Sequence, residues 1–296
     1  MLKSHIKNML LYGGIDRADF DAIRPMVWRR NLDSLRITAW LAAGLGATIL
    51  VLNHFLRSGT QAPYLILLGG SALTLCLLPL LRGKSEPREV WSLLLCYGQM
   101  ILICGYAIFL STQAANYDTP ATSAIVFIAL LPLSIDDRPA RMFAVMLGES
   151  ILYLLFSHMM KSPHAFSLDA MNVATFCMVG MILYAVVCTR NLRELWQSER
   201  IQKMTTEIFK LLDCRGTVRI DFILDEHDML FVNEPNTIPG SLAFYLWKEC
   251  GVDFAKLAEI MVEDALRAHA DKNSNVYAFD STILQKVVAG TKGAKR

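Results

Sequence analysis

Two short stretches in the last third of the chain carry side chains that could do metal and phosphate chemistry. Residues 217–224 alternate between polar and apolar side chains, and residues 229–234 form a second run rich in strand-forming residues. The intervening residues 225–228, Asp-Glu-His-Asp, favour a turn. Two such strands joined by four residues predict a β-hairpin.

The register of this hairpin decides which side chains share a face. If Leu224 pairs with Met229, then Arg219 lies opposite Glu234. Directly opposed residues share a face, and alternate residues of a strand return to it. One face is therefore expected to carry the polar residues Arg219, Asp221, Glu234 and Asn236. The other face should cover a core with Val218, Ile220, Phe222 and Leu224.

Two carboxylates, one amide oxygen and one guanidinium on a common face suit a site for magnesium and phosphate. Mg²⁺ prefers oxygen ligands and takes one or two carboxylates, with phosphate and water completing its shell. Arginine offers a planar pair of donors to a phosphate or to a developing oxyanion. The alternative is a solvated strand face on which Arg219 and Glu234 form a cross-strand ion pair. Spacing alone favours neither interpretation.

Residues 214–247 closely resemble the D-alanine–D-alanine ligases of the ATP-grasp superfamily. The motif of that family reads R-x-D-F, followed by N-E-x-N-T-x-P-G. This chain matches the motif at nine positions: Arg219, Asp221, Phe222, Asn233, Glu234, Asn236, Thr237, Pro239 and Gly240. The likeness extends from about residue 201 to about residue 284, which is under a third of the chain, and includes an expected helix at 254–269 and the tail 277–281.

The resemblance implies roles for the matched residues. Asp221, Glu234 and Asn236 correspond to magnesium ligands. Arg219 and the backbone of Gly240 correspond to the groups that stabilise a tetrahedral oxyanion, and Ser241 corresponds to a contact with the carboxylate of the second D-alanine. The chain departs from the family at Pro235, where an aliphatic residue is usual and where proline lacks the N–H that a strand donates.

The resemblance also implies that most of a ligase is missing before the hairpin. A ligase of this family has an N-terminal domain that binds the first D-alanine and a central domain whose lysines and glycine-rich loop hold ATP. Between Arg190 and Gly216 the sequence has no glycine-rich phosphate loop. Phosphoryl transfer depends chiefly on positioning and charge stabilisation. ATP is therefore expected as a co-substrate only if another chain completes the site.

The elements that precede this region are predicted to be membrane helices. The chain is 54% hydrophobic, with a mean hydropathy of +0.37. A spanning helix needs about 20 mostly apolar residues. Six runs meet or approach that length: 37–56, 64–81, 90–111, 121–135, 142–160 and 171–188. The fourth run is the shortest, but it is uncharged and lies between Asp118 and the pair Asp136-Asp137.

Basic residues in alternate loops predict the orientation of these helices. Lysine and arginine are frequent before the first run, in the second and fourth loops and after the sixth run, whereas the other loops hold only Arg57 and Lys161. Positive residues collect on the cytoplasmic side of a membrane. This pattern predicts six spans in a bacterial plasma membrane with both termini in the cytosol, and membrane lipid as a partner.

The layout of a short N-terminal helical segment, six spans and a charged exit helix resembles the six-helix unit at the front of some bacterial diguanylate cyclases. The stretch MLLYGGIDRADFDAIRP adds to this likeness. The G-G-[DE]-E-F signature of the cyclase itself is absent from the sequence, so no cyclase activity is implied. Glu149, within the fifth run, is a functional group by default. Alternatively it is protonated or hydrogen-bonded to a neighbouring helix.

These features predict a membrane all-α six-helix bundle followed by a small α+β domain, a partial ATP-grasp unit. The expected parts are an amphipathic lead-in at 1–36 with Ile6, Met9 and Leu10 on one face, the bundle at 37–189, a linker helix at 190–200 and the ligase-like part at 201–296. The apolar stripes before and after residues 197–200 are out of phase, which indicates a boundary there. All seven cysteines are expected to act as small apolar residues, because no C-x-x-C pair occurs.

Three functions remain open from the sequence. The chain could carry an incomplete ligase domain that is inactive alone, or anchor a ligase whose missing parts come from a separate ligase chain. It could also be a non-enzymatic membrane sensor or scaffold that reuses the fragment, as a homo-oligomer or otherwise. D-alanine is the expected small-molecule partner. Nucleic acid is not expected, since the net charge is +2 and no basic cluster is dense enough.

Overall fold

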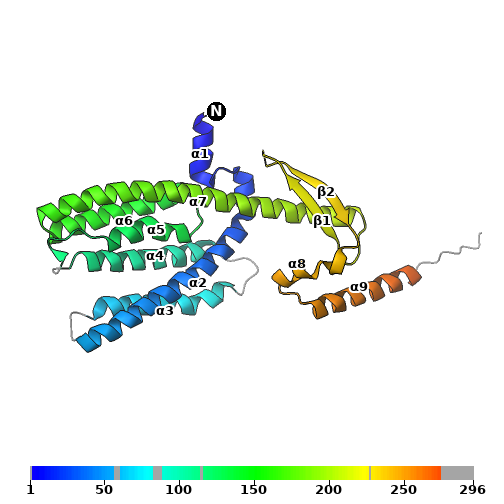
Figure 1. The fold of residues 1–296 in the computed structure, drawn as a ribbon, viewed down its shortest axis with the longest axis horizontal. Helices are drawn as coiled ribbons and strands as arrows, with labels where there is room; N and C mark the ends of the chain where they lie inside the picture. Colours follow the sequence, from blue (N-terminus) through cyan, green and yellow to red (C-terminus); the bar gives the residue numbers. More distant parts are fainter. Residues whose placement is uncertain (1, 57–60, 83–88, 114–115, 227, 275–296) are drawn as a thin grey trace, which may run out of the picture. The chain divides into compact units, whose positions relative to one another are not determined.

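The computed structural model describes residues 2–56, 61–82, 89–113, 116–226 and 228–274 (Figure 1). The expected tail at 277–281 lies outside these residues. Contacts divide the chain between Glu199 and Arg200 into two units. This division falls at the end of the predicted linker, although one helix runs through it without a break. In the described part the chain is mostly helical with one small two-stranded sheet, as predicted.

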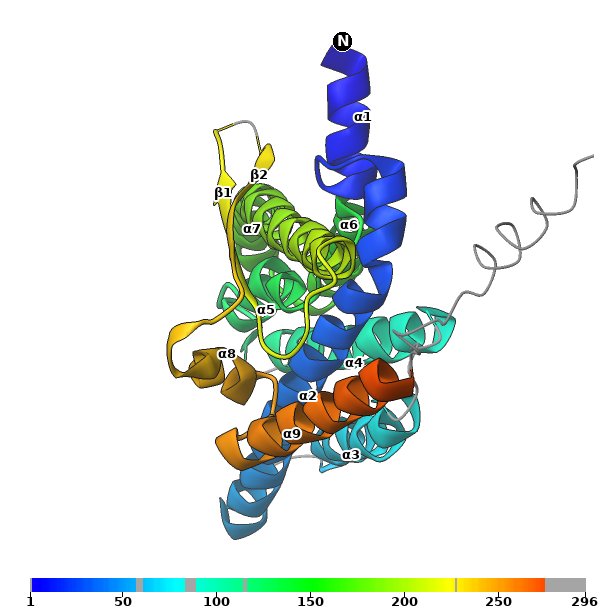
Figure 2. The ribbon, with the colours of Figure 1, turned by 90° about the vertical axis from the view of Figure 1, so that its right-hand side faces the viewer.

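The first unit consists of helices in the described residues. They are α1 (Leu2–Tyr12), α2 (Arg17–Leu56), α3 (Ala62–Arg82), α4 (Glu89–Ser111), α5 (Ser123–Leu130) with the 3-10 turn η2 (Leu131–Ser134), α6 (Pro139–Met160) and α7 (Pro163–Leu211). α2 packs along α3, and α4 along α5 (Figures 1 and 2). Five of the helices, α2, α3, α4, α6 and α7, are long and apolar enough to cross a membrane. Large apolar side chains such as Phe55 and Leu80 are exposed on them, which is compatible with membrane insertion.

The fourth predicted run forms only a short helical segment, α5 with η2. Residues 123–134 give a helical length of only about 18 Å, against a hydrocarbon core of about 30 Å. Hydrogen bonds nevertheless fix both ends of this segment. The hydroxyls of Ser111 and Ser123 lie 2.9 Å apart, and the Tyr97 hydroxyl donates to Asp137 at 2.7 Å. Residues 123–137 therefore run antiparallel to residues 97–111 of α4.

The second half of the predicted lead-in contributes to the core of the first unit. α2 begins at Arg17 and continues without interruption past residue 36 into the first apolar run. The expected stripe is partly exposed, with Ile6 at 48% and Met9 at 41%. A different stripe at helical spacing is buried instead: Phe20, Ile23, Val27, Trp28, Leu32 and Leu35.

Two glycines allow close approaches that a side chain would prevent. Gly13 turns the chain between α1 and α2 at φ +64°, and a Cβ there would lie 2.4 Å from the side chain of Leu192. A Cβ on Gly180 in α7 would lie 2.9 Å from the carbonyl oxygen of Ala129 in α5. α7 therefore packs directly against the backbone of α5, as small residues permit between apolar helices.

The second unit contains the predicted hairpin and the helices after it. The strands are β1 (Arg219–Leu224) and β2 (Leu230–Asn236), followed by the 3-10 turn η3 (Gly240–Ala243), α8 (Phe244–Glu249) and α9 (Phe254–Ser274). The hairpin and the helix expected at 254–269 both form, and that helix continues to Ser274.

Candidate functional site

The hairpin forms in a register different from the predicted one. Leu224 pairs with Leu230 rather than with Met229, and a register shift follows between Asp221 and Phe222. The turn explains the difference, because Met229 pairs with Asp225: its N–H donates to the Asp225 carboxylate at 2.7 Å and its carbonyl accepts the Asp225 N–H at 3.1 Å. Asp228 completes the turn at a left-handed φ of +59°.

The four polar residues of the motif nevertheless share one face of the hairpin. Arg219 lies opposite Asn236, and Asp221 lies opposite Glu234. The predicted partner of Arg219 was Glu234, which is two residues away from the observed one. A shift of two residues leaves these four side chains on their common face, whereas the shift of one near the turn exchanges the faces of β2 there.

The predicted apolar face is only partly buried. Val218, Ile220 and Phe222 are half-buried, but Leu224 is 43% exposed, so its expected place in a core is wrong. Ile223 and Phe231, which oppose each other on the polar face near the turn, are also more than half exposed. In the described part of the chain the sheet has two strands, and its apolar residues near the turn are the more exposed ones.

Arg219 binds Asp221 on its own strand instead of crossing to Glu234. Its Nε and Nη2 atoms donate to the two oxygens of Asp221, both at 3.0 Å. This hydrogen-bonded pair raises the pKa of Arg219 above its ordinary value. The predicted cross-strand ion pair with Glu234 is thus replaced by a pair within β1.

The other predicted ligands lie at the open end of β2. Glu234 is exposed, and the Asn236 side-chain oxygen accepts the Ile238 N–H at 3.1 Å. No group of three His, Cys, Asp or Glu side chains in the described residues could hold a metal ion. The predicted set is smaller, with two carboxylates and one amide oxygen, and a magnesium ion would take its remaining ligands from phosphate and water.

The turn after β2 has an unusual backbone. Ser241, Leu242 and Ala243 all have φ values between +50° and +55°, the left-handed region that non-glycine residues rarely adopt. Gly240 and Ser241 are exposed at this turn. Strained residues of this kind cost about 1–3 kcal/mol each and cluster at binding and active sites. The strain therefore lies where the resemblance places an oxyanion donor and a substrate contact.

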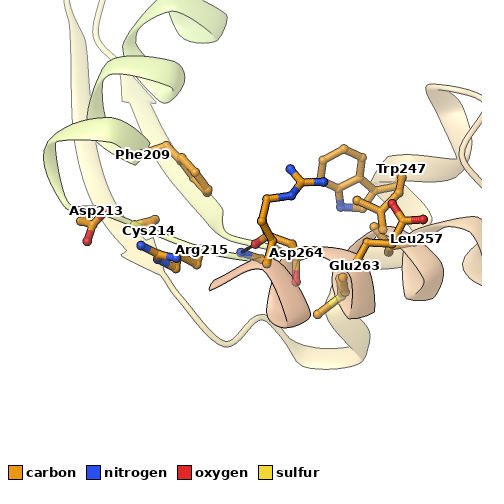
Figure 3. A pocket seen from close by; sticks show the side chains of 13 residues that line it. Phe209, Asp213, Cys214, Arg215, Trp247, Leu257, Glu263 and Asp264 are labelled. Carbon is orange, nitrogen blue, oxygen red and sulfur yellow. Dashed lines mark hydrogen bonds between the residues drawn. The ribbon is translucent and has the colours of Figure 1, made fainter. Parts of the chain in front are cut away.

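A cavity of about 420 Å³ lies elsewhere in the second unit, between the end of α7 and α9. Phe209 and Trp247 stand on opposite sides of it (Figure 3). Gly216 N–H, on its wall, donates to Asp264 at 3.4 Å. None of the six predicted site residues lines this cavity, so they form an open strand face and turn rather than a pocket. The sequence pattern did not indicate the cavity.

Glu149 is buried among the helices of the first unit. Both of its carboxylate oxygens are buried, and their polar partner in the described residues is the thiol of Cys104 on α4, a weak donor. An unpaired charge is costly in an apolar environment, and a buried carboxyl group avoids this cost by binding a proton. Both interpretations of Glu149, a functional group and a group hydrogen-bonded to a neighbouring helix, therefore stay open.

Comparison with known proteins gives a match for the C-terminal part. Residues 184–263 match the family model for the D-ala D-ala ligase C-terminus. The D-alanine–D-alanine ligase of Thermosipho africanus is 37% identical over 84 residues, which are 28% of this chain and 23% of that protein. The ligase of Thermosipho melanesiensis is 38% identical over 86 residues, 29% and 23% of the two chains. That of Staphylococcus saprophyticus is 37% identical over 84 residues, 27% and 24%.

The match confirms the ligase resemblance, over residues 184–263 instead of the expected range from about 201 to about 284. It begins at residue 184, inside α7 and before the expected start near residue 201. The chain spans less than a quarter of the length of these relatives. No solved structure matches the chain. The expected likeness to diguanylate cyclases gains no support from these matches and stays a hypothesis.

Proposed function

We propose that this chain carries the magnesium- and oxyanion-binding end of a D-alanine–D-alanine ligase on a membrane anchor, and that it forms no dipeptide alone. One observation carries the proposal. The register brings Arg219, Asp221, Glu234 and Asn236, which the ligase motif contains, to one face of the hairpin. The matched relatives support the same assignment, since all three are D-alanine–D-alanine ligases.

The Arg219–Asp221 pair suggests how this face would work. A bound magnesium ion would supply positive charge to the phosphate groups that it contacts. An ionised carboxylate has about four acceptor positions, and Arg219 uses two of those on Asp221. As Asp221 turned toward the metal, its bonds with Arg219 would weaken. The guanidinium would then be free to donate to an oxyanion beside the Gly240 backbone.

Metal binding tests this proposal. Purified full-length chain in detergent is expected to bind Mn²⁺ weakly, measured as loss of the free-ion signal in electron paramagnetic resonance. Asp221→Asn and Glu234→Gln should each lower the affinity by about tenfold or more, because each removes a charged ligand. Glu259→Gln on α9 is the control, since Glu259 is exposed and pairs only with Lys256 in the described structure. Equal Mn²⁺ affinity in all three variants would show that the hairpin face binds no metal.

We further propose that the first unit crosses a bacterial plasma membrane six times, with both termini in the cytosol. The alternating loop charges support this, and so does the fourth segment, which runs antiparallel to α4 from Ser123 to Asp137. Its polar ends, with serine hydroxyls at one side and Asp137 at the other, fit the two surfaces of a bilayer. The short α5 would then cross where neighbouring helices shield its extended end.

Reporter fusions test this topology. Fusions after Gly59, Asn116 and Ser162 are expected to report the outside of the membrane, and fusions after Gly83, Asp137 and Arg200 the inside. Alkaline phosphatase and a fluorescent protein are suitable reporters, because each is active on one side only. A cytoplasmic signal at Asn116 would contradict the six-span topology, and an outside signal at Asp137 would mean that the fourth segment does not cross.

A non-enzymatic sensor or scaffold is the second candidate. α7 favours it, because this single helix extends from Pro163 to Leu211 and leads from the last apolar run into the ligase-like part. A displacement of the helix within the membrane could then reach the C-terminal part. This candidate predicts that no added polypeptide restores ligation, whereas the ligase proposal allows a partner to do so.

A further inference from the structure

The loop between η2 and α6 is buried, although it only connects two elements. In this 135–138 loop, Ile135, Asp136 and Asp137 are all 5% exposed or less. Connections normally run over the surface, because a buried loop has backbone groups that water cannot satisfy. Here side chains from several helices take the place of water.

α2 satisfies the backbone of Asp136 through a single asparagine. The Asn31 side chain, 1% exposed, donates to the Asp136 carbonyl at 2.8 Å and accepts the Asp136 N–H at 2.8 Å. These are the two bonds that a neighbouring β-strand would make. Arg30 adds its charge, with Nε 3.5 Å from the Asp136 carboxylate.

α7 binds the same loop through three side chains on one helical face. Asn191 donates to the Asp136 carboxylate at 2.8 Å. The Tyr184 hydroxyl pairs with both the carbonyl oxygen and the N–H of Asp137, each at 3.0 Å, and the Cys188 thiol donates to the same carbonyl at 3.1 Å. Because Tyr184, Cys188 and Asn191 are four and three residues apart, they point the same way from the helix.

Two more helices hold the Asp137 carboxylate. Tyr97 of α4 donates to it at 2.7 Å, and Arg141 of α6 at 2.9 Å. Arg138 lies 5.7 Å from the ring centre of Tyr12 in α1 and 5.5 Å from that of Phe20 in α2. The loop thus joins α1, α2, α4, α6 and α7. Breaking one of its buried bonds would leave a polar group without a partner.

The contacts of α7 with the 135–138 loop lie near the end of the buried part of this helix. Leu192, packed at Gly13, is the last buried residue of this helix in the described structure. The stretch from residue 193 to Leu211 has only exposed or partly buried side chains, of which Leu195 and Trp196 still pack against the core. The contacts at Tyr184, Cys188 and Asn191 are therefore among the last that hold α7 to the bundle before it leads into the second unit.

We infer that the 135–138 loop holds α7 at the end of the helix bundle, and that releasing it frees α7 from about residue 184 onward while its earlier half stays packed. The loop would then set the position of the helix that leads to the ligase-like part. The attachment of α7 by the 135–138 loop depends on contacts within residues 1–199 alone. Its test is therefore independent of metal binding and of any ligase activity.

Cysteine alkylation on the full-length chain in membranes measures this release. Cys188, 1% exposed, lies within the loop's contacts, and Cys177, 6% exposed, lies earlier on the same helix. Asn31→Ala removes both bonds to the Asp136 backbone. The rate of N-ethylmaleimide labelling, followed by peptide mass spectrometry, should rise about tenfold or more at Cys188 and stay unchanged at Cys177. Thr48→Ala is the control, because Thr48 lies exposed on the same helix as Asn31 and its hydroxyl donates to the Gly44 carbonyl of that helix.

The two cysteines separate the possible outcomes. If Cys188 is as protected in Asn31→Ala as in the Thr48→Ala control, the loop does not hold α7 and the inference is wrong. If Asn31→Ala exposes Cys177 as well, the bundle has opened as a whole. Asn191→Ala then decides, since it removes one bond to the Asp136 carboxylate. Selective labelling of Cys188 in that variant would support the inference, and protection of Cys188 would contradict it.

Discussion

Lys161→Met is expected to lower the free energy of unfolding of the first unit by about 3–5 kcal/mol, because it leaves a buried carboxylate without its counter-charge. Lys161 Nζ lies 2.9 Å from Asp169 Oδ2, and the solvent exposure of both side chains is 0%. Methionine resembles the lysine stem in length and flexibility, so packing changes little. The effect should therefore come from the lost charge.

Asp169 is the centre of a larger buried cluster at this end of the bundle. Its Oδ2 atom also accepts hydrogen bonds from Tyr153 at 2.6 Å and Ser157 at 2.7 Å, and its Oδ1 atom accepts the Ala121 N–H at 2.8 Å. Lys161 itself donates to the Thr119 carbonyl at 3.0 Å. The cluster thus connects α6, the start of α7 and the segment before α5. Loss of the lysine should weaken the contacts among all three segments together.

Denaturation of the detergent-solubilised chain, followed by circular dichroism, measures this loss. Arg17→Met is the matched control, because Arg17 and Asp21 form an exposed pair at 3.8 Å with side-chain exposures of 78% and 41%. Surface pairs of this kind contribute about 0–1 kcal/mol. A loss for Lys161→Met no larger than that of the control would show that the cluster adds little to stability.

Purified full-length chain given ATP, Mg²⁺ and D-alanine is expected to release no D-Ala–D-Ala. Phosphoryl transfer requires both positioning and charge stabilisation of the nucleotide. The matched relatives are more than four times longer than the part that they share with this chain. An open hairpin face cannot exclude water or orient two substrates.

A dipeptide assay by mass spectrometry checks this expectation, with a whole ligase at equal concentration as the positive control. Steady dipeptide formation that Asp221→Ala abolishes would overturn the expectation. It would mean that the apolar helices, or residues beyond the described part, supply the nucleotide site. Dipeptide formation that Asp221→Ala leaves unchanged would instead indicate a contaminating ligase.

The long helices could be predicted because their signal is local. A run of about 20 apolar residues has few alternatives to a helix, and the expected runs 64–81 and 90–111 agree with α3 and α4 to within two residues. The buried stripe at the start of α2 was missed for the opposite reason. Its charged neighbours lower the average hydropathy, and only its partners in the fold show which face is inside.

The register of the hairpin could be predicted only in part from the local sequence. Alternation predicted the strands and the common face, but Met229 pairs with Asp225 in the turn, which shifts the register at Leu224 by one residue. Contacts between distant residues were beyond prediction altogether. Asn31 and Asp136 are 105 residues apart, and Lys161 was interpreted only as a loop charge. Such pairs leave no periodic pattern in a single sequence, because each partner alone looks like an ordinary polar residue.

A chimaeric ligase tests the central claim most directly. The 84 residues that the Thermosipho africanus ligase shares with this chain would be replaced by the corresponding residues of this chain. If the hairpin face and turn keep the ligase chemistry, the chimaera should form D-Ala–D-Ala with ATP and Mg²⁺. Arg219→Met in the chimaera should then lower kcat by about 10²–10³-fold, the effect of removing an oxyanion donor. A chimaera that folds and binds ATP but forms no dipeptide would contradict the account.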